Sequence, residues 1–270
     1  MTANNLTICI DAPCNKKCPY CISNMTFYPK PDALLFGKNI GKAINMAQMA
    51  SVSSVLISSK GEPLLNMNVV LFCCISFVNF PLEIQTNGLS LTPELIKKLH
   101  NLRVNTIALS VDKYTDLFDF KHYKLCNDLG INIRITVVLS DLWKPPTGYD
   151  FLADCNQLGI KQVTFRMLSI PLHELTTESS HKTVEWIEKH QINRGNLEMF
   201  LEPLHSYEKP ENLIRKLSFG PSVYSMEGVA VTTMPYCIQE SNNTEDIRSL
   251  IYHQDGHMYT SWDKKASILF

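Results

Sequence analysis

The sequence predicts an α/β fold in which a parallel sheet curves into a partial or complete barrel. Three observations lead to this class. Six short apolar segments recur over the first 170 residues, and segments with helical periodicity separate them. Parallel strands need crossover connections, which such helices provide. The strands are expected at residues 6–10, 53–59, 82–86, 105–111, 131–139 and 161–168.

Helices are expected in the connections between these strands. Asp32 is a candidate N-cap for a helix that follows Pro31, and Thr92 is a candidate N-cap for a helix that begins with Pro93. Further helices are expected in the apolar run after Leu65 and around residues 114–129 and 148–158.

The last hundred residues lose this alternation. Helices are predicted at 180–192 and around 210–217, and Asp255-Gly256 lies between two runs rich in Ile, Tyr and Thr, which predicts a β-hairpin. We therefore expect a core barrel over residues 1–175. Residues 176–270 are expected to form a C-terminal extension, with helices and a β-hairpin, that caps the barrel and contributes to substrate binding.

The composition limits the class of protein. The 270 residues are 45% hydrophobic and 19% charged, as in an ordinary globular protein with a sizeable core. A formal net charge of -1 disfavours a surface built to bind nucleic acid. No export signal is recognisable, and no apolar stretch reaches the roughly 18 residues of a membrane span. The sequence thus predicts a cytoplasmic protein with no membrane partner, in which the nine cysteines are reduced.

Cys14, Cys18 and Cys21 lie in the polar segment APCNKKCPYCIS, directly after the first predicted strand. Loops at the carboxyl ends of parallel strands converge on one face of the fold, where cofactors bind. A structural zinc site needs four ligands, and no second Cys or His pair follows at a matching spacing. Three thiolates suit an iron-sulfur cluster with one open iron. Cys73 and Cys74 lie in an apolar run and are expected in the core, so a second cluster is not expected.

The spacing Cys-x3-Cys-x2-Cys, with Tyr20 just before the third cysteine, resembles the signature of the radical S-adenosylmethionine (radical SAM) enzymes. The resemblance covers about residues 5–170 and implies a partial (βα)6 TIM-like barrel. Three strand ends carry further similar motifs, which are KGEP at 60–63, QTNG at 85–88 and LSVD at 109–112. Lys60 departs from the pattern, because the family usually has a glycine there.

This resemblance implies one oxygen-sensitive 4Fe-4S cluster on the three cysteines, S-adenosylmethionine on the open iron, and a reductant such as flavodoxin or ferredoxin. Glu62 would receive the ammonium group of S-adenosylmethionine. Arg166 is a candidate substrate contact, although Arg134 and Arg166 are equally compatible with structural ion pairs. The residues expected to contact S-adenosylmethionine are Tyr20, Gly61, Glu62, Pro63, Thr86, Asn87, Ser110 and Arg134.

The resemblance leaves the substrate open. Hydrogen abstraction from a small sugar, nucleotide or nucleoside-like molecule is favoured over modification of a ribosomally made peptide or a tRNA, and over a degenerate protein that binds a cluster without catalysis. Cys237 is a candidate hydrogen donor or an ordinary buried thiol. The final hairpin is either a surface turn or a substrate lid, and its candidate residues are His253, Asp255, His257, Tyr259 and Trp262.

Overall fold

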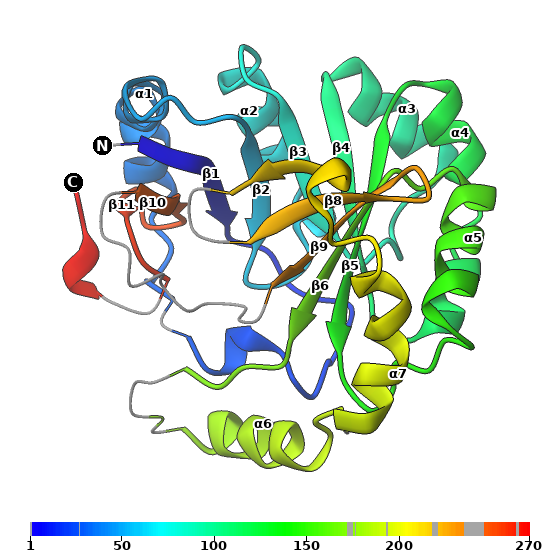
Figure 1. Cartoon of the computed structure of the whole chain (residues 1–270). Helices are drawn as coiled ribbons and strands as arrows, with labels where there is room; N and C mark the ends of the chain where they lie inside the picture. Colours follow the sequence, from blue (N-terminus) through cyan, green and yellow to red (C-terminus); the bar gives the residue numbers. More distant parts are fainter. Residues whose placement is uncertain are drawn as a thin grey trace.

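In the part of the chain that the computed structural model describes, eleven strands form one large sheet. The strand order is β11-β10-β1-β2-β3-β4-β5-β6-β9-β8-β7 (Figure 1). The structure describes residues 2–26, 28–171, 175, 177–192, 194–217, 221–234, 246–262 and 265–270, without the side chains of Arg194, Asn196, Met199 and Asp246. The strands are β1 (Thr2–Ile10), β2 (Val55–Ser59), β3 (Leu82–Thr86), β4 (Val104–Val111), β5 (Asn132–Leu139), β6 (Gln162–Met167), β7 (Leu213–Lys216), β8 (Ser222–Met226), β9 (Val229–Met234), β10 (Asp246–His253) and β11 (Met258–Tyr259).

The first six strands confirm the predicted α/β class. They pair in parallel and in chain order, and each lies where the apolar segments predicted it. The helices between them are also confirmed, with Asp32 and Thr92 accepting hydrogen bonds from the Leu35 and Leu95 amides at 2.9 and 3.3 Å. These helices are α1 (Ala33–Met49), α2 (Met67–Ser76), α3 (Pro93–Asn101), α4 (Tyr123–Asp128) and α5 (Gly148–Leu158), with a 3-10 turn η3 (Tyr114–Phe118) before α4.

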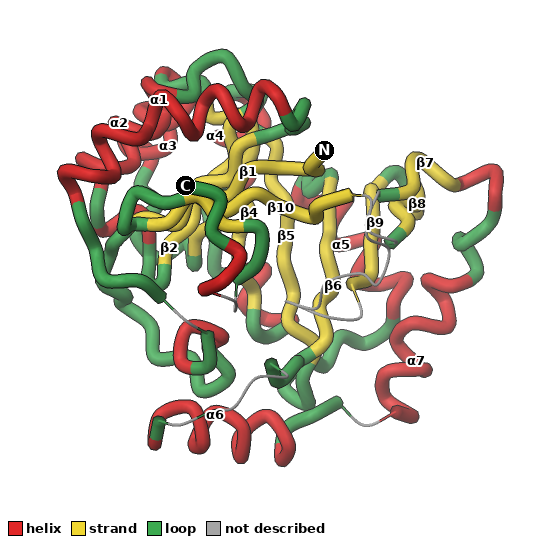
Figure 2. Tube along the Cα trace, turned by 90° about the vertical axis from the view of Figure 1, so that its left-hand side faces the viewer, coloured by secondary structure: helices red, strands yellow, loops and turns green. Residues whose placement is uncertain are grey.

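The two faces of the sheet differ in chemistry. On β5, Ile133, Ile135 and Val137 are fully buried in the apolar core. The alternate residues Arg134 and Thr136 point to the opposite face, because successive side chains of a strand alternate. Figure 2 shows α1, α2 and α3 along the outer side of the sheet and α6 (Glu178–Lys189) apart from them. The core therefore lies between sheet and helices, and the inner face is left polar.

The C-terminal part of the chain supplies strands to both edges of the six-stranded core. β9 pairs in parallel with β6, and β10 pairs in parallel with β1, so β1 and β6 do not meet and the barrel stays open. Helix α6 lies beyond the carboxyl ends of β5 and β6 (Figure 1). The predicted division near residue 175 stays a prediction. Within the described residues, no helix is long and apolar enough to cross a membrane.

Two expectations for this region differ from the structure. The helix predicted around 210–217 is wrong, because a 3-10 turn (Pro210–Asn212) leads directly into β7. The β8–β9 hairpin was not predicted. At its turn, Glu227 and Gly228 both have positive φ, which is the conformation that tight hairpins need. Helix α7 (Arg194–His205) was also missed, and Pro203 within it obscures the helical pattern.

The hairpin predicted at Asp255-Gly256 is confirmed, with β10 and β11 antiparallel and Tyr252 opposite Met258. Gly256 has φ +78°, and its backbone lies against the first turn of α1. A Cβ at this position would come within 2.5 Å of the Leu35 carbonyl carbon and the Phe36 nitrogen. The carbonyl of Gly256 also accepts a hydrogen bond from the Asn39 side chain at 2.9 Å. The turn therefore fixes the C-terminal hairpin to the first helix.

We expect Gly256→Ala to destabilise the protein more than Gly130→Ala. Both glycines have positive φ, which costs an alanine roughly 1–2 kcal/mol, but Gly130 has open space around it. At Gly256 the overlap with backbone adds roughly 1–3 kcal/mol. The free energies of unfolding of the two variants, measured in urea, check this. Equal losses would show that the turn does not pack against α1 as described.

Candidate functional site

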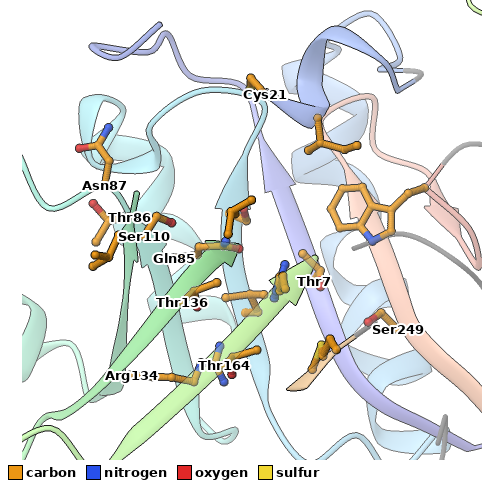
Figure 3. A pocket seen from close by; sticks show the side chains of 18 of the residues that line it. Thr7, Cys21, Gln85, Thr86, Asn87, Ser110, Arg134, Thr136, Thr164 and Ser249 are labelled. Carbon is orange, nitrogen blue, oxygen red and sulfur yellow. The ribbon is translucent and has the colours of Figure 1, made fainter. Parts of the chain in front are cut away.

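A cavity of about 690 Å³ follows the polar inner face of the sheet to the carboxyl ends of the parallel strands. Cys21 lies at one end of this cavity, and Arg134 and Thr164 lie at the other (Figure 3). Pro63 does not line the cavity but starts a buried 3-10 turn, and Cys237 lies outside the described residues. Of the residues predicted for the site, those that line the cavity are Cys14, Cys18, Tyr20, Cys21, Gly61, Glu62, Thr86, Asn87, Ser110, Arg134 and Arg166.

The three cysteines lie on the loop between β1 and η1 (Ile22–Asn24). Cys14 is exposed, Cys18 and Cys21 are half-buried, and all three are free thiols. In the described part of the chain, no three His, Cys, Asp or Glu side chains stand close enough together to hold a metal ion. The thiols share a cavity without forming a closed ligand cage. Their assignment as cluster ligands therefore stays a prediction that rests on spacing and on this common position.

Gly61, at the end of β2, holds the cysteine loop in place. A Cβ at this position would overlap the carbonyl oxygens of Ala12 and Pro13, so the loop packs directly on the glycine backbone. The amide of Glu62 donates to the same Pro13 oxygen at 2.7 Å. The loop is thus fixed with its thiols along the cavity. Three free thiols on an anchored loop are a donor set that fits a cluster with one open iron.

Glu62 links the ends of two strands. Its carboxylate is 2% exposed and accepts hydrogen bonds from the Thr86 hydroxyl at 2.7 Å, the Asn87 amide at 2.8 Å and the Leu64 amide at 3.1 Å. The Asn87 side chain in turn donates to Asn15 of the cysteine loop at 2.7 Å. The predicted role of Glu62 at the ammonium group of S-adenosylmethionine stays a prediction. The hydrogen bonds show that this glutamate also orders the loops around it.

Asp112, at the end of β4, is a second anchor of the cysteine loop, and sequence reasoning did not select it. It accepts hydrogen bonds from Lys16 at 2.9 Å and from the Tyr20 hydroxyl. Burial, and then Asp112, raise the pKa of Tyr20, so the phenol stays protonated and donates. The Tyr20 ring also contacts Trp186 of α6, with centroids 5.4 Å apart. A carboxylate directly after a predicted strand was the signal available in the sequence.

Arg134 has a protein partner at the far end of the cavity, since its guanidinium forms an ion pair with Glu83 of β3. Burial raises the pKa of Glu83 and lowers that of Arg134, and each partner partly offsets the shift of the other. This position favours the structural ion pair that was the alternative for Arg134.

Lys60, which stands where the family usually has a glycine, lies near the opposite end of the cavity. Its ammonium group is 5.2 Å from the centre of the Tyr28 ring, and both residues line the cavity.

Most of the candidate residues of the final hairpin contact other protein groups and do not line the cavity. His253 is 1% exposed and contacts the rings of Tyr28, Tyr259 and Trp262. Asp255 accepts hydrogen bonds from the His257 amide and the Tyr259 hydroxyl. Trp262 lines the cavity, so one residue of this region does reach the site.

The cysteine loop and the cavity lie at the carboxyl ends of parallel strands, which is where α/β barrel enzymes carry their active sites. Residues 13–138 match the family model for the radical SAM superfamily. This segment, which runs from the cysteine loop into β5, is therefore identified as a radical SAM domain. The cofactors of this class are a 4Fe-4S cluster and S-adenosylmethionine, as the cysteine motif predicted.

Comparisons with solved structures support the fold. The chain is similar to Streptococcus suis SuiB bound to S-adenosylmethionine, with 15% identity and a TM-score of 0.58 over 96% of this chain. It spans 60% of the SuiB chain. Native anSMEcpe with bound AdoMet is similar at 16% identity and a TM-score of 0.60, over 95% of this chain and 73% of the other. No curated protein sequence matches the chain.

We expect Gly61→Ala to lower the amount of iron that the protein binds by at least half, because the new Cβ displaces the loop that carries the thiols. Gly41→Ala, on an open face of α1, is the matched control and should bind iron as the wild type does. Iron per chain after anaerobic reconstitution is the measurement. Wild-type iron content in a folded Gly61→Ala protein would contradict the role of this contact.

We expect the stability of the protein to fall between pH 6.5 and pH 4. Burial lowers the pKa of His253 to about 4, from 6.5 in the unfolded chain. The unfolded state therefore binds the proton first as the pH falls, and the loss reaches about 3 kcal/mol below pH 4. Urea unfolding at several pH values, compared with His253→Gln, measures this contribution. An unchanged slope in the variant would refute it.

Proposed function

We propose that this chain cleaves S-adenosylmethionine reductively and uses the resulting radical to remove a hydrogen atom from a small polar molecule. The observation that carries the proposal is the convergence of the three cysteines with Gly61, Glu62, Thr86, Asn87 and Ser110 on one cavity. These residues come from four strand ends that are distant in sequence. Their common position supports a shared role in binding the cofactors.

The chain's own residues would hold, orient and shield the reactants. Cys14, Cys18 and Cys21 would hold the cluster, and the contacts of the loop with Gly61 and Asp112 keep it in place. Trp186 of α6 lies against Tyr20 and would shield that side of the cysteine loop. When bound, the cluster supplies the electron that breaks a sulfonium bond of S-adenosylmethionine and yields the 5'-deoxyadenosyl radical.

We also propose the setting in which this reaction takes place. Cys14 is exposed, which gives a flavodoxin or ferredoxin a short path for electron transfer to the cluster. The eight cysteines in the described residues are all free, as a reducing cytoplasm would keep them. Contact with oxygen would damage a cluster with one open iron, so the enzyme should be handled without oxygen.

The size and lining of the cavity favour a small substrate. Its volume lies within the roughly 300–1,000 Å³ typical of sites for small ligands. Polar side chains such as Thr7, Gln85, Thr136 and Thr164 line its inner wall (Figure 3). A sugar, nucleotide or nucleoside-like molecule satisfies this wall better than an apolar one does.

One observation favours a second candidate, the modification of a peptide. β7 is an exposed strand at the sheet edge, Ile214 is 54% exposed, and both Ile214 and Arg215 line the cavity. Such an edge can pair with an extended peptide. SuiB, whose fold is similar, is described bound to the precursor peptide SuiA. Transfer of deuterium into 5'-deoxyadenosine from a labelled peptide, and not from labelled small molecules, would establish this alternative.

We expect Cys14→Ala, Cys18→Ala and Cys21→Ala each to abolish formation of 5'-deoxyadenosine and to prevent assembly of a complete cluster. Cys126→Ala, which changes a buried core thiol, is the control and should keep both properties. Iron, sulfide and 5'-deoxyadenosine are measured after anaerobic reconstitution with dithionite as reductant.

Two results would contradict parts of this proposal. A complete cluster and turnover in any of the three variants would refute the ligand assignment. A wild-type protein that binds a complete cluster and S-adenosylmethionine but forms no 5'-deoxyadenosine would instead support a cluster-binding protein without catalysis.

A further inference from the structure

A row of hydroxyl side chains crosses the inner face of the sheet. Ser110 of β4 pairs in register with Thr136 of β5, Thr136 pairs with Thr164 of β6, and Thr164 pairs with Thr232 of β9. All four residues line the cavity. In a closed (βα)8 barrel, bulky branched side chains fill this position. Here the row forms a polar floor that stays accessible from the cavity.

Two buried donors on this floor lack a partner among the described residues. The Thr136 hydroxyl belongs to a residue that is 3% exposed, and it makes no hydrogen bond there. Nε of Arg134, two residues earlier on the same face of β5, is also buried and makes no hydrogen bond with the described residues. By contrast, the Thr232 hydroxyl donates to the Ser222 carbonyl at 2.9 Å. An unmade hydrogen bond on a buried donor is costly, so Thr136 and Arg134 are placed to donate to a ligand.

The charges around the floor are mainly positive. Arg166 follows Thr164 by two residues on β6, so it lies on the same face. Its charge lowers the pKa of both Glu83 and Arg134. Arg215 of β7 also lowers the pKa of Arg134. This set of interacting charges thus contains three guanidinium groups, those of Arg134, Arg166 and Arg215, and one carboxylate, that of Glu83. The carboxylates among the described lining residues, Glu62 and Asp112, are at the strand ends near the cysteine loop.

We propose that the part of this floor around Thr136 is an anion subsite, at which Arg166, Arg134 and the Thr136 hydroxyl bind a carboxylate or phosphate of the substrate. The proposal rests on the proposed function and names its substrate class. Guanidinium groups and hydroxyls together donate the several hydrogen bonds that such an anion accepts.

The position of the subsite limits the size of the substrate. Thr136 lies three residues before the end of β5, which is about 10 Å along a strand. An anion held on the floor would therefore lie about 10 Å from the level of the strand ends, where the thiols are. A small hydroxylated anion, such as a sugar phosphate, a sugar acid or a nucleotide, spans this distance with its uncharged part toward the cysteine loop.

Calorimetric titration of the full chain tests the subsite. The protein is reconstituted without oxygen and saturated with S-adenosylmethionine in the absence of a reductant, so that the cofactor is not consumed. Inorganic phosphate and acetate are the probes, and sodium chloride at equal ionic strength is the blank. Tighter binding of phosphate would favour a phosphorylated substrate, and tighter binding of acetate a carboxylate, and either result supports the subsite.

The variants separate the subsite from general effects of charge and shape. Arg166→Gln should weaken binding of the preferred anion roughly 10-fold or more, and Thr136→Val roughly 3- to 10-fold. Thr232→Val makes the same change of side chain in the same row and should leave anion affinity as in the wild type. Arg103→Gln removes one exposed positive charge elsewhere and should also have no effect. If Arg166→Gln fails to fold, Arg166→Lys, which keeps the charge but loses the planar fork, should give a smaller loss.

Several results would overturn the inference. Neither anion binding above the chloride blank, or equal losses in Thr136→Val and Thr232→Val, would exclude the subsite. Anion binding that appears in a parallel titration without S-adenosylmethionine but is lost when the protein is saturated with it would assign the floor to the carboxylate of that cofactor and exclude a substrate role. Formation of 5'-deoxyadenosine is then measured on the same preparation after dithionite is added, so a protein that binds phosphate but does not cleave S-adenosylmethionine under these conditions would refute the proposed function and leave the subsite intact.

Discussion

The contact between the cysteine loop and the end of β2 determines where the chemistry of this protein can take place. At Gly61 the backbone of one segment lies directly on the carbonyl groups of the other, and no side chain fits between them. The next residue, Glu62, then uses its amide for the loop and its carboxylate for the end of β3. Three neighbouring strand ends are thereby joined through two consecutive residues. The loop position depends on backbone packing, which side-chain motion does not relax.

The sheet separates stability from function between its two faces. The outer face carries fully buried aliphatic residues such as Ile133 and Ile135 under the helices, where burial of apolar area stabilises the fold. The inner face carries hydroxyls and guanidinium groups that line the cavity. Because successive side chains alternate between the two faces, one strand can supply apolar residues to the core and polar residues to the cavity. β9 and β10 pair with the two outer strands of the six-stranded core, so β1 and β6 do not meet, and the inner face stays open along the cavity.

The features that depend on neighbours in sequence were predictable. The apolar segments gave the six core strands, Asp32 and Thr92 marked helix starts, and the spacing of the cysteines identified the family. The partners of Tyr20 and Arg134 were not predictable, because Asp112 and Glu83 meet them only once the sheet curves. The helix expected around 210–217 failed because Leu213 to Lys216 pair with β8, and this tertiary pairing overrides a short local pattern.

The pairing of β1 with β10 has a consequence for how the chain folds. Thr2 to Ile10 are made well before their second partner, Asp246 to His253, which lies far along the sequence from them. Until then β1 can pair only with β2, and its other side is an unpaired sheet edge that can associate with other chains. Closing a loop of this length also makes the last pairing slow. β1, which leads into the cysteine loop, therefore gains its full support only after β10 has been made.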